Sequence, residues 1–343
     1  MELRVLYFLT FLFSAMLSAL CIPWFCRTAG KWLTDKPGGL KMHQQQVPMV
    51  GGCAIFVATI LSLMGLRLFT NFPTGTLHSL RGVLGAGMLI FLLGLLDDLR
   101  KPKGLPVYVR LAVQVVAAML LVYYGVFVQA FPFMWLNYVV TFLWLLMVTN
   151  AFNLLDIADG LCISQALICA IGLVWISLPG ELWYVNFAAL ALAGAGLSFW
   201  PYNHKQNKVF LGDSGATFLG FMLAALAMGT QYSQVNSYGY AAPLFIMAVP
   251  LFDTLYVSIA RVLQGKNPLK GSNDHLALCL KKWGWPNWII LLIFAIVAIA
   301  CNLVAWMVTR LSTYHTQAVC VLALLMGGMC IVWLLQKLHT STH

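Results

Sequence analysis

Long apolar segments separated by short polar ones are the feature that most constrains this chain. Of its 343 residues, 61% are hydrophobic and only 9% are charged, whereas an ordinary soluble domain is about 25% charged. A segment of about 20 apolar residues crosses a bilayer as a helix, because only a helix satisfies its own backbone polar groups there. We therefore predict an all-α integral membrane protein, with residues 1–343 forming a single polytopic membrane domain.

The apolar segments predict about eleven transmembrane helices. The third and the eighth are short, and each borders an acidic motif. The predicted segments are Val5–Cys26, Met49–Leu68, Gly82–Leu96, Val107–Val128, Phe133–Thr149, Leu161–Leu178, Leu182–Trp200, Gly215–Gly229, Tyr240–Ala260, Trp288–Val308 and Gln317–Leu335.

The basic residues predict the orientation of these helices. With the N-terminus outside, 16 of the 20 Lys and Arg residues fall on the cytoplasmic side, which is the distribution that the positive-inside rule requires. The C-terminus is then cytoplasmic. Acidic residues do not enter this rule, yet seven of the ten fall on the same side: Asp35, Asp97, Asp98, Asp156, Asp159, Asp213 and Asp274. The sequence thus predicts a carboxylate-rich site at the cytoplasmic face.

Four polar residues recur at every third position of the segment Asn150–Leu161, between two uncharged apolar segments. They are Asn150, Asn153, Asp156 and Asp159. Side chains with a period of three stay on one face only if the helix tightens toward 3₁₀ geometry. Carboxylates at the edge of hydrocarbon are costly and require a metal, a partner or a substrate, so this pattern indicates a site rather than a polar loop.

Two shorter motifs border the short helices. Asp97 and Asp98 are adjacent acids, followed at once by Arg100 and Lys101; this arrangement favours a divalent cation beside the carboxylates and phosphate oxygens on the cations. Gly212 lets the backbone approach a ligand beside Asp213, ahead of a predicted helix N-terminus. No Gly-Lys-Ser/Thr follows, so the second motif is not a P-loop.

Two further segments carry weaker signals. Lys41 and His43 precede Pro48 and a Gly-Gly pair, and both side chains are suited to an anionic substrate. Asp274 and His275 are the acid–histidine neighbours of the chain and lie in the longest cytoplasmic loop. Each segment alone is also compatible with topology-setting charge or a solvated loop. The nine cysteines form no Cys-x-x-Cys pair, so neither a zinc site nor a disulfide framework is indicated.

Taken together, the motifs resemble those of the polyprenyl-phosphate N-acetylhexosamine-1-phosphate transferases, the WecA and MraY type, from about Asp35 to Trp283. The resemblance rests on the Lys/His–Pro–Gly-Gly entry, Asp-Asp-Leu-Arg, Asn-x-x-Asn-x-x-Asp-x-x-Asp-Gly, Phe210–Gly215, Pro250–Thr254 and Asp274-His275-Leu. It implies transfer of a sugar phosphate, most simply N-acetylglucosamine-1-phosphate, from a UDP-sugar to undecaprenyl phosphate in the bacterial cytoplasmic membrane. UMP is released, and the lipid-linked sugar initiates a cell-surface polysaccharide such as O-antigen, enterobacterial common antigen or teichoic acid.

The resemblance also implies roles for individual residues. Asn153 and Asp213 would hold Mg²⁺, with Mn²⁺ as an alternative, and Asp97 and Asp98 would lie beside the attacking lipid phosphate as catalytic residues. Asp159 would face the uracil and Asp156 the wall of the site. The remaining substrate contacts would come from Lys41, His43, Arg100, Lys101, Lys208, Gly212, Asp274 and His275. No nucleic-acid partner is implied, and a homo-oligomer is left open.

Two departures concern the sugar. Ile157 stands where the related core usually has glycine, and the histidine-rich loop of the family is reduced to His275. UDP-QuiNAc or UDP-FucNAc are therefore alternatives to UDP-GlcNAc. A secondary transporter is the alternative of another class, but transporters place their sites near the bilayer midplane and often contain inverted repeats. Here the acids lie at one face and the sequence shows no repeat.

Overall fold

The computed structural model describes residues 3–35, 46–69, 74–178, 183–204, 209–230, 232, 235–267 and 274–340. Almost all of the regular structure in these ranges is helical, and the two strands are two residues long each. Most of the helices are strongly apolar, so the predicted class, a helical membrane protein, is confirmed. The chain divides into two compact units, Met1–Thr230 and Gln231–His343, and the single-domain organisation stays a prediction.

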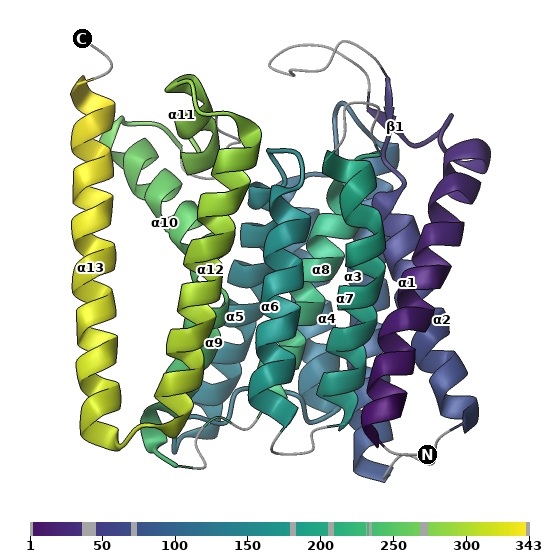
Figure 1. Cartoon of the computed structure of the whole chain (residues 1–343), viewed down its shortest axis with the longest axis horizontal. Helices are drawn as coiled ribbons and strands as arrows, with labels where there is room; N and C mark the ends of the chain where they lie inside the picture. The colour runs from purple at the N-terminus through teal and green to yellow at the C-terminus, as the bar shows by residue number, and fades with distance from the viewer. Residues whose placement is uncertain are drawn as a thin grey trace. The chain divides into compact units, whose positions relative to one another are not determined.

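The first unit contains eight helices and a short β-hairpin among its described residues (Figure 1). The strands β1 (Thr34–Asp35) and β2 (Val47–Pro48) are antiparallel, with Asp35 opposite Val47. The helices are α1 (Leu3–Thr28), α2 (Gly51–Phe69), α3 (Thr74–Leu99), α4 (Val107–Tyr123), α5 (Met134–Leu155), α6 (Leu161–Ser177), α7 (Trp183–His204) and α8 (Gly212–Met228).

Helix α8 forms the centre of the first unit. It packs against α2, α3, α5, α6 and α7, and nearly all of its residues are buried. Its sequence is rich in Gly and Ala, and small residues let helix backbones approach closely in the absence of water. A helix buried on all sides cannot move easily, so the residues at its N-terminus are held in place by the whole unit.

Helices α1 and α7 also pack closely through a small residue. A Cβ atom added at Gly194 would lie 2.2 Å from the carbonyl oxygen of Phe11, so the two backbones are in direct contact. Ser14 and Ser18 of α1 donate to the carbonyl oxygens of Ala191 and Ala195, at 2.6 and 2.9 Å. These bonds satisfy the hydroxyl groups without water, which fixes the register of α7 and the position of its C-terminal turn.

The second unit contains the remaining described helices. They are η2 (Ser237–Ala241), α9 (Ala242–Ile246), α10 (Ala248–Leu263), α11 (Leu276–Lys282), α12 (Asn287–Arg310) and α13 (Thr313–Thr340). The segments Ser237–Ile246 and Ala248–Leu263 are bent by 73° relative to each other. The sequence predicted one straight helix over Tyr240–Ala260, and Pro243 and Pro250, which lie near the break, favour the bend because proline removes a helical hydrogen bond.

Within the described residues, seven helices are long and apolar enough to cross a membrane, or eight if the bent pair counts as one span. The shorter apolar helices α4, α6 and α8 have 17 residues each. A helix of that length rises about 25 Å, below the hydrocarbon thickness of about 30 Å. All eleven predicted segments therefore correspond to apolar helices, but three of them fall at the lower limit of a span.

Candidate active site

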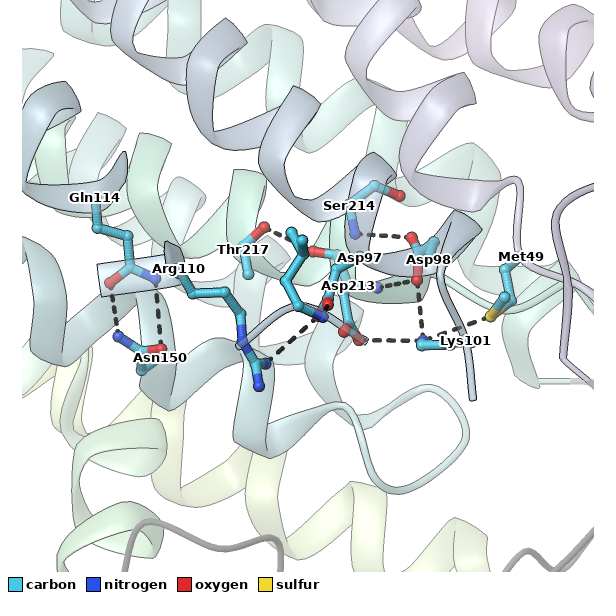
Figure 2. A network of polar contacts seen from close by, with 11 residues as sticks. Met49, Asp97, Asp98, Lys101, Arg110, Gln114, Asn150, Asp213, Ser214 and Thr217 are labelled. Atoms are coloured by element: carbon cyan, nitrogen blue, oxygen red, sulfur yellow. Dashed lines mark hydrogen bonds and ion pairs between the residues drawn. The ribbon is translucent and has the colours of Figure 1, made fainter. Parts of the chain in front are cut away.

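The end of α3 and the start of α8 meet at the centre of the acidic residues. A Cβ atom added at Gly94 would lie 2.5 Å from the Cα atom of Ser214, so only glycine allows this approach of the two helices. The crossing places Asp97 and Asp98, in the last turn of α3, beside Asp213 and Ser214 in the first turn of α8 (Figure 2). Two motifs more than 110 residues apart are thereby brought together, as the sequence predicted.

Asp98 acts as a cap for α8. Its Oδ1 accepts a hydrogen bond from the backbone N–H of Asp213 at 2.9 Å, and its Oδ2 accepts one from Ser214 at 3.0 Å. These N–H groups belong to the first turn and have no partner within the helix. Gly212 has φ +76°, and a Cβ atom there would lie 2.6 Å from Asp98 Oδ2. Gly212 thus makes room for the cap.

Lys101 bridges the two acids. Its Nζ lies 2.9 Å from Asp98 Oδ1 and 3.2 Å from Asp213 Oδ1, and 3.5 Å from the sulfur of Met49 (Figure 2). Burial alone would lower the pKa of this lysine, but the carboxylates of Asp213 and Asp98 outweigh burial and raise its pKa above the ordinary value. Lys101 therefore stays cationic at neutral pH and neutralises part of the acidic cluster.

Asp97 points to a different set of partners. It accepts a hydrogen bond from the backbone N–H of Leu105 and lies 3.4 Å from Arg110 Nη1. The Asp97 carboxyl group also lies close to that of Asp213. Arg110, at the start of α4, was not among the residues predicted for the site, because it is 13 residues away from Asp97. Arg100, which the sequence placed beside phosphate, is exposed.

The four polar residues Asn150, Asn153, Asp156 and Asp159 do not lie on one face of a single helix. Asn150 and Gln114 of α4 exchange hydrogen bonds, 2.8 Å from Asn150 Nδ2 and 3.4 Å from Gln114 Nε2, and Asn150 also donates to Leu146 O. Asn150 therefore joins α4 to α5 rather than contributing to a site. The helix stays α-helical to Leu155 and then turns, without tightening to 3₁₀ geometry. The pattern of every third residue therefore wrongly assigned Asn150 to the predicted site.

Asn153 and Asp156 are the next two members of this pattern. The Oδ1 atom of Asn153 is buried and has no hydrogen-bond partner among the described residues. Burial raises the pKa of Asp156 to about 7; Lys101 opposes this effect, while Asp213, Asp98 and Asp159 add to it. Asp156 is thus near enough to Lys101, Asp213 and Asp98 for their charges to affect it.

Asn203, in the last turn of α7, was missed by the sequence analysis. It is buried, its Oδ1 accepts from the backbone N–H of Gly160 at 2.9 Å, and its Nδ2 donates to Val209 O at 3.1 Å. It therefore joins the turn after Asp159 to the segment that leads into α8. The only sequence signal was a polar residue at the C-terminal end of an apolar segment.

Lys41, His43 and Lys208 lie outside the described residues. The segments next to them are joined: Phe210 N donates to Pro48 O at 2.8 Å, and Gly52 N donates to Leu211 O at 2.9 Å. The Pro-Gly-Gly entry and the Gly212–Asp213 motif are therefore neighbours. The predictions for the three basic residues themselves stay predictions.

Asp274 and His275 belong to the second unit. Asp274 lies 3.9 Å from Arg261 Nη1, and His275 Nδ1 lies 2.7 Å from Asp253 Oδ2. Asp253 is buried within the apolar helix α10, and the histidine is the partner that its burial requires. The adjacency of Asp274 and His275 in the sequence did not predict their separate partners.

The donor set of the first unit suits a hard cation. Carboxylate and amide oxygens are the ligands that Mg²⁺ prefers, and it usually takes one or two carboxylates together with substrate phosphates. Asp213 supplies a carboxylate and Asn153 a buried oxygen without a partner. Within the described residues no group of three His, Cys, Asp or Glu side chains is arranged as a complete metal site. The chemistry of these donors is compatible with a magnesium ion.

Comparison with known proteins gives consistent similarities. The model of glycosyl transferase family 4 matches residues 80–231, which span α3 to α8. A probable undecaprenyl-phosphate N-acetylglucosaminyl 1-phosphate transferase of Bacillus subtilis is 28% identical over 73% of this chain and 70% of its own length. The undecaprenyl-phosphate alpha-N-acetylglucosaminyl 1-phosphate transferase of Escherichia coli O157:H7 is 25% identical over 94% and 90%. A decaprenyl-phosphate N-acetylglucosaminephosphotransferase of Mycolicibacterium smegmatis is 30% identical over 68% and 65%.

Proposed function

Because the chain belongs to glycosyl transferase family 4 and is a multi-pass membrane protein, we propose that it is a phosphotransferase of lipid-linked sugar synthesis. It transfers N-acetylglucosamine-1-phosphate from UDP-GlcNAc to undecaprenyl phosphate and releases UMP. The product is the lipid diphosphate sugar that starts a cell-surface polysaccharide. The activities named for the three relatives support this class of reaction.

One observation carries the proposal: the chain joins Asp97, Asp98, Lys101 and Asp213 in one network at the crossing of α3 and α8 (Figure 2). Phosphoryl transfer depends mainly on positioning and on charge stabilisation rather than on covalent chemistry. A rigid crossing that holds Lys101 against Asp98 and Asp213, and Arg110 against Asp97, provides both.

In the proposed reaction an oxygen of the lipid phosphate attacks the β-phosphorus of the UDP-sugar. The new O–Pβ bond replaces the bond between Pβ and the oxygen that bridges it to Pα, and UMP leaves with that oxygen. A phosphate monoester is already largely ionised at pH 7, since its second pKa is about 6. The main task of Lys101 and Arg110 is therefore to balance the charge of the phosphate groups, and that of Asp97 is to position the groups around them.

Asn153 and Asp213 are the proposed ligands of Mg²⁺. When bound, the ion neutralises charge on the diphosphate oxygens, which is the usual contribution of a divalent cation to phosphoryl transfer. Asp98 would support this site through α8, since it holds the backbone N–H of Asp213. Both of its oxygens are held by the first turn of α8 and one of them also by Lys101, so of the two adjacent acids Asp97 is the better candidate for contact with the lipid phosphate.

The remaining assignments complete the proposal. Asp159 is proposed to face the uracil, Asp156 the wall of the site, and Asp274 and His275 the nucleotide sugar. The protein is proposed to cross the bacterial inner membrane about eleven times, with the N-terminus outside and the site and C-terminus in the cytoplasm. UDP-QuiNAc and UDP-FucNAc are the alternative donors, because Ile157 and the single loop histidine concern sugar recognition.

The test is nucleotide release by the purified protein in detergent. With Mg²⁺, undecaprenyl phosphate and a panel of UDP-sugars, we expect UMP to be released with at least one donor, and only when the lipid phosphate is present. Mass spectrometry of the lipid product identifies the sugar. Release of UDP instead of UMP, or no release with any donor, would contradict the proposal, and transport of a substrate without chemistry would favour the transporter alternative.

A further inference from the structure

The turn between α5 and α6 is held through both polar groups of one glycine. Gly160 has φ +81°, which glycine adopts without strain. Its backbone N–H donates to Asn203 Oδ1 at 2.9 Å, and its carbonyl oxygen accepts from Ser164 Oγ at 2.5 Å. Ser164 Oγ in turn accepts from Trp200 Nε1 at 2.8 Å. Since Trp200 and Asn203 both belong to the C-terminal end of α7, one helix end holds Gly160 from both sides.

The same helix end holds the segment that leads into α8. Val209 donates from its backbone N–H to Tyr202 O at 3.2 Å, and its own carbonyl oxygen accepts from Asn203 Nδ2 at 3.1 Å. The two residues that follow, Phe210 and Leu211, bond to β2 and to the start of α2. The first turn of α8 is therefore approached by a segment that is fixed on two sides.

Asn203 links two parts of the chain that are far apart in the sequence. It is buried, and both ends of its amide group bind the backbone, so it acts through what it holds. Gly160 directly follows Asp159, and the charges of Lys101 and Asp213 affect Asp156 of the same turn. The turn at Asp159 and the helix start at Asp213 thus belong to one neighbourhood, and the end of α7 joins them.

We propose that Asn203 and Trp200 are positioning residues, which hold the turn at Asp159 in register with Asp213 so that both meet the UDP-sugar. The proposal rests on the function above, in which Asp159 faces the uracil and Asp213 holds Mg²⁺ on the diphosphate. Neither Asn203 nor Trp200 contacts the substrate in this arrangement.

The contacts of Asp97 make the expected effect selective. Asp97, the proposed partner of the lipid phosphate, is held by the backbone N–H of Leu105 and by Arg110, and neither contact involves α7. Loosening the end of α7 should therefore weaken the binding of the UDP-sugar and leave the lipid phosphate unaffected. A purely structural bond would not distinguish between the two substrates.

The test combines calorimetric binding of UDP in the presence of Mg²⁺ with steady-state UMP release, the UDP-sugar and the lipid phosphate being varied separately. UDP carries the uracil and the diphosphate that all candidate donors share. For Asn203→Ala we expect the affinity for UDP, and kcat/KM for the UDP-sugar, to fall roughly tenfold, as the loss of buried hydrogen bonds gives. The KM for the lipid phosphate should stay within about a factor of two.

Trp200→Phe is the milder variant, because it removes the N–H group that bonds to Ser164 and keeps an aromatic ring. We expect a fall of roughly two- to fivefold in the affinity for UDP. Ser198→Ala is the matched control, since Ser198 lies on the same helix and donates to Ala15 O of α1 at 2.7 Å. It loses one buried bond away from the turn and should bind UDP as the unaltered protein does.

A double substitution tests whether Asn203 acts through the turn. In the Asp159→Ala protein, Asn203→Ala should lower the affinity for UDP less than about threefold further, since residues that act as a unit are not additive. If the effects of the two substitutions multiply fully, Asn203 does not act through Asp159, and this outcome includes the case in which Asp159→Ala alone has no effect.

The proposal is overturned by full multiplication, by an unchanged affinity for UDP in Asn203→Ala, or by an equal loss for both substrates. If Asn203→Ala does not fold, as judged by gel filtration, the same three criteria apply to Trp200→Phe. Absence of both UDP binding and UMP release in the unaltered protein would instead contradict the proposed function.

Discussion

Two polar regions of the first unit differ in whether the protein itself supplies hydrogen-bond partners for their buried side chains. At the crossing of α3 and α8, both oxygens of Asp98 are bonded by backbone N–H groups and by Lys101. At the end of α5, the Oδ1 atom of Asn153 has no partner among the described residues, and burial raises the pKa of Asp156 to about 7.

This difference distinguishes side chains that hold the protein framework together from side chains that are available to bind a ligand. A buried polar group that the protein itself satisfies contributes to folding, whereas one left unsatisfied costs free energy and calls for an external partner. Asp98 therefore belongs to the framework that positions Asp213, while Asn153 has the buried oxygen that a metal or substrate would bind. Four substitutions test this division, from the largest expected effect to the smallest.

The first substitution is Asp213→Asn, which removes the proposed charged metal ligand where the two regions meet. We expect UMP release to fall roughly 100- to 1000-fold at saturating Mg²⁺, because removing one electrostatic contact to the transition state typically costs that much. Thermal unfolding should show that the protein stays folded. Turnover close to that of the unaltered protein would place the metal elsewhere.

Asp98→Asn tests the framework side. An amide has one acceptor oxygen, so one N–H group of the first turn of α8 loses its partner; we expect a loss of about 1–3 kcal/mol in the free energy of unfolding. Because Asp213 is held through this turn, kcat should fall about tenfold or more while UDP-sugar binding, measured by calorimetry, changes little. Loss of nucleotide binding with normal stability would reverse the roles of the two regions.

Asp159→Ala tests the ligand side at a point remote from the reacting phosphorus. A contact made equally in the ground state and the transition state affects KM and leaves kcat unchanged. We expect the KM for the UDP-sugar to rise about tenfold, as a loss of about 1.4 kcal/mol would give, with kcat within a factor of two. A KM equal to that of the unaltered protein would remove Asp159 from the nucleotide site.

Gln114→Leu should have the smallest effect. It breaks the amide pair with Asn150, which retains its bond to Leu146 O, so we expect a loss of about 1 kcal/mol in stability. The activity per folded molecule should stay the same, because the pair lies between α4 and α5 and not among the acidic residues. A selective loss of activity would return Asn150 to the site.

The sequence predicted the parts of the fold and site that depend on local patterns. Apolar length located the helices, and the adjacent acids Asp97 and Asp98, with Lys101 close behind, identified the end of α3. It did not predict the partners of Asp97 and Asp253, since Arg110 and His275 are 13 and 22 residues away and only packing brings them close. It also grouped Asn150 with Asn153, because a period of three cannot show which side chain a neighbouring helix will satisfy.

The central claim is that the β-phosphorus of the nucleotide sugar moves to the lipid. The direct measurement uses UDP-GlcNAc labelled with ³²P at the β-phosphate, undecaprenyl phosphate and Mg²⁺, followed by extraction of the lipid phase. If another sugar was identified as the donor, its labelled UDP form is used in the same way. The account predicts that the label enters the lipid together with the sugar, in equal amount to the UMP released. Label that stays in the aqueous phase while the sugar enters the lipid would show glycosyl transfer without the phosphate and would contradict the account.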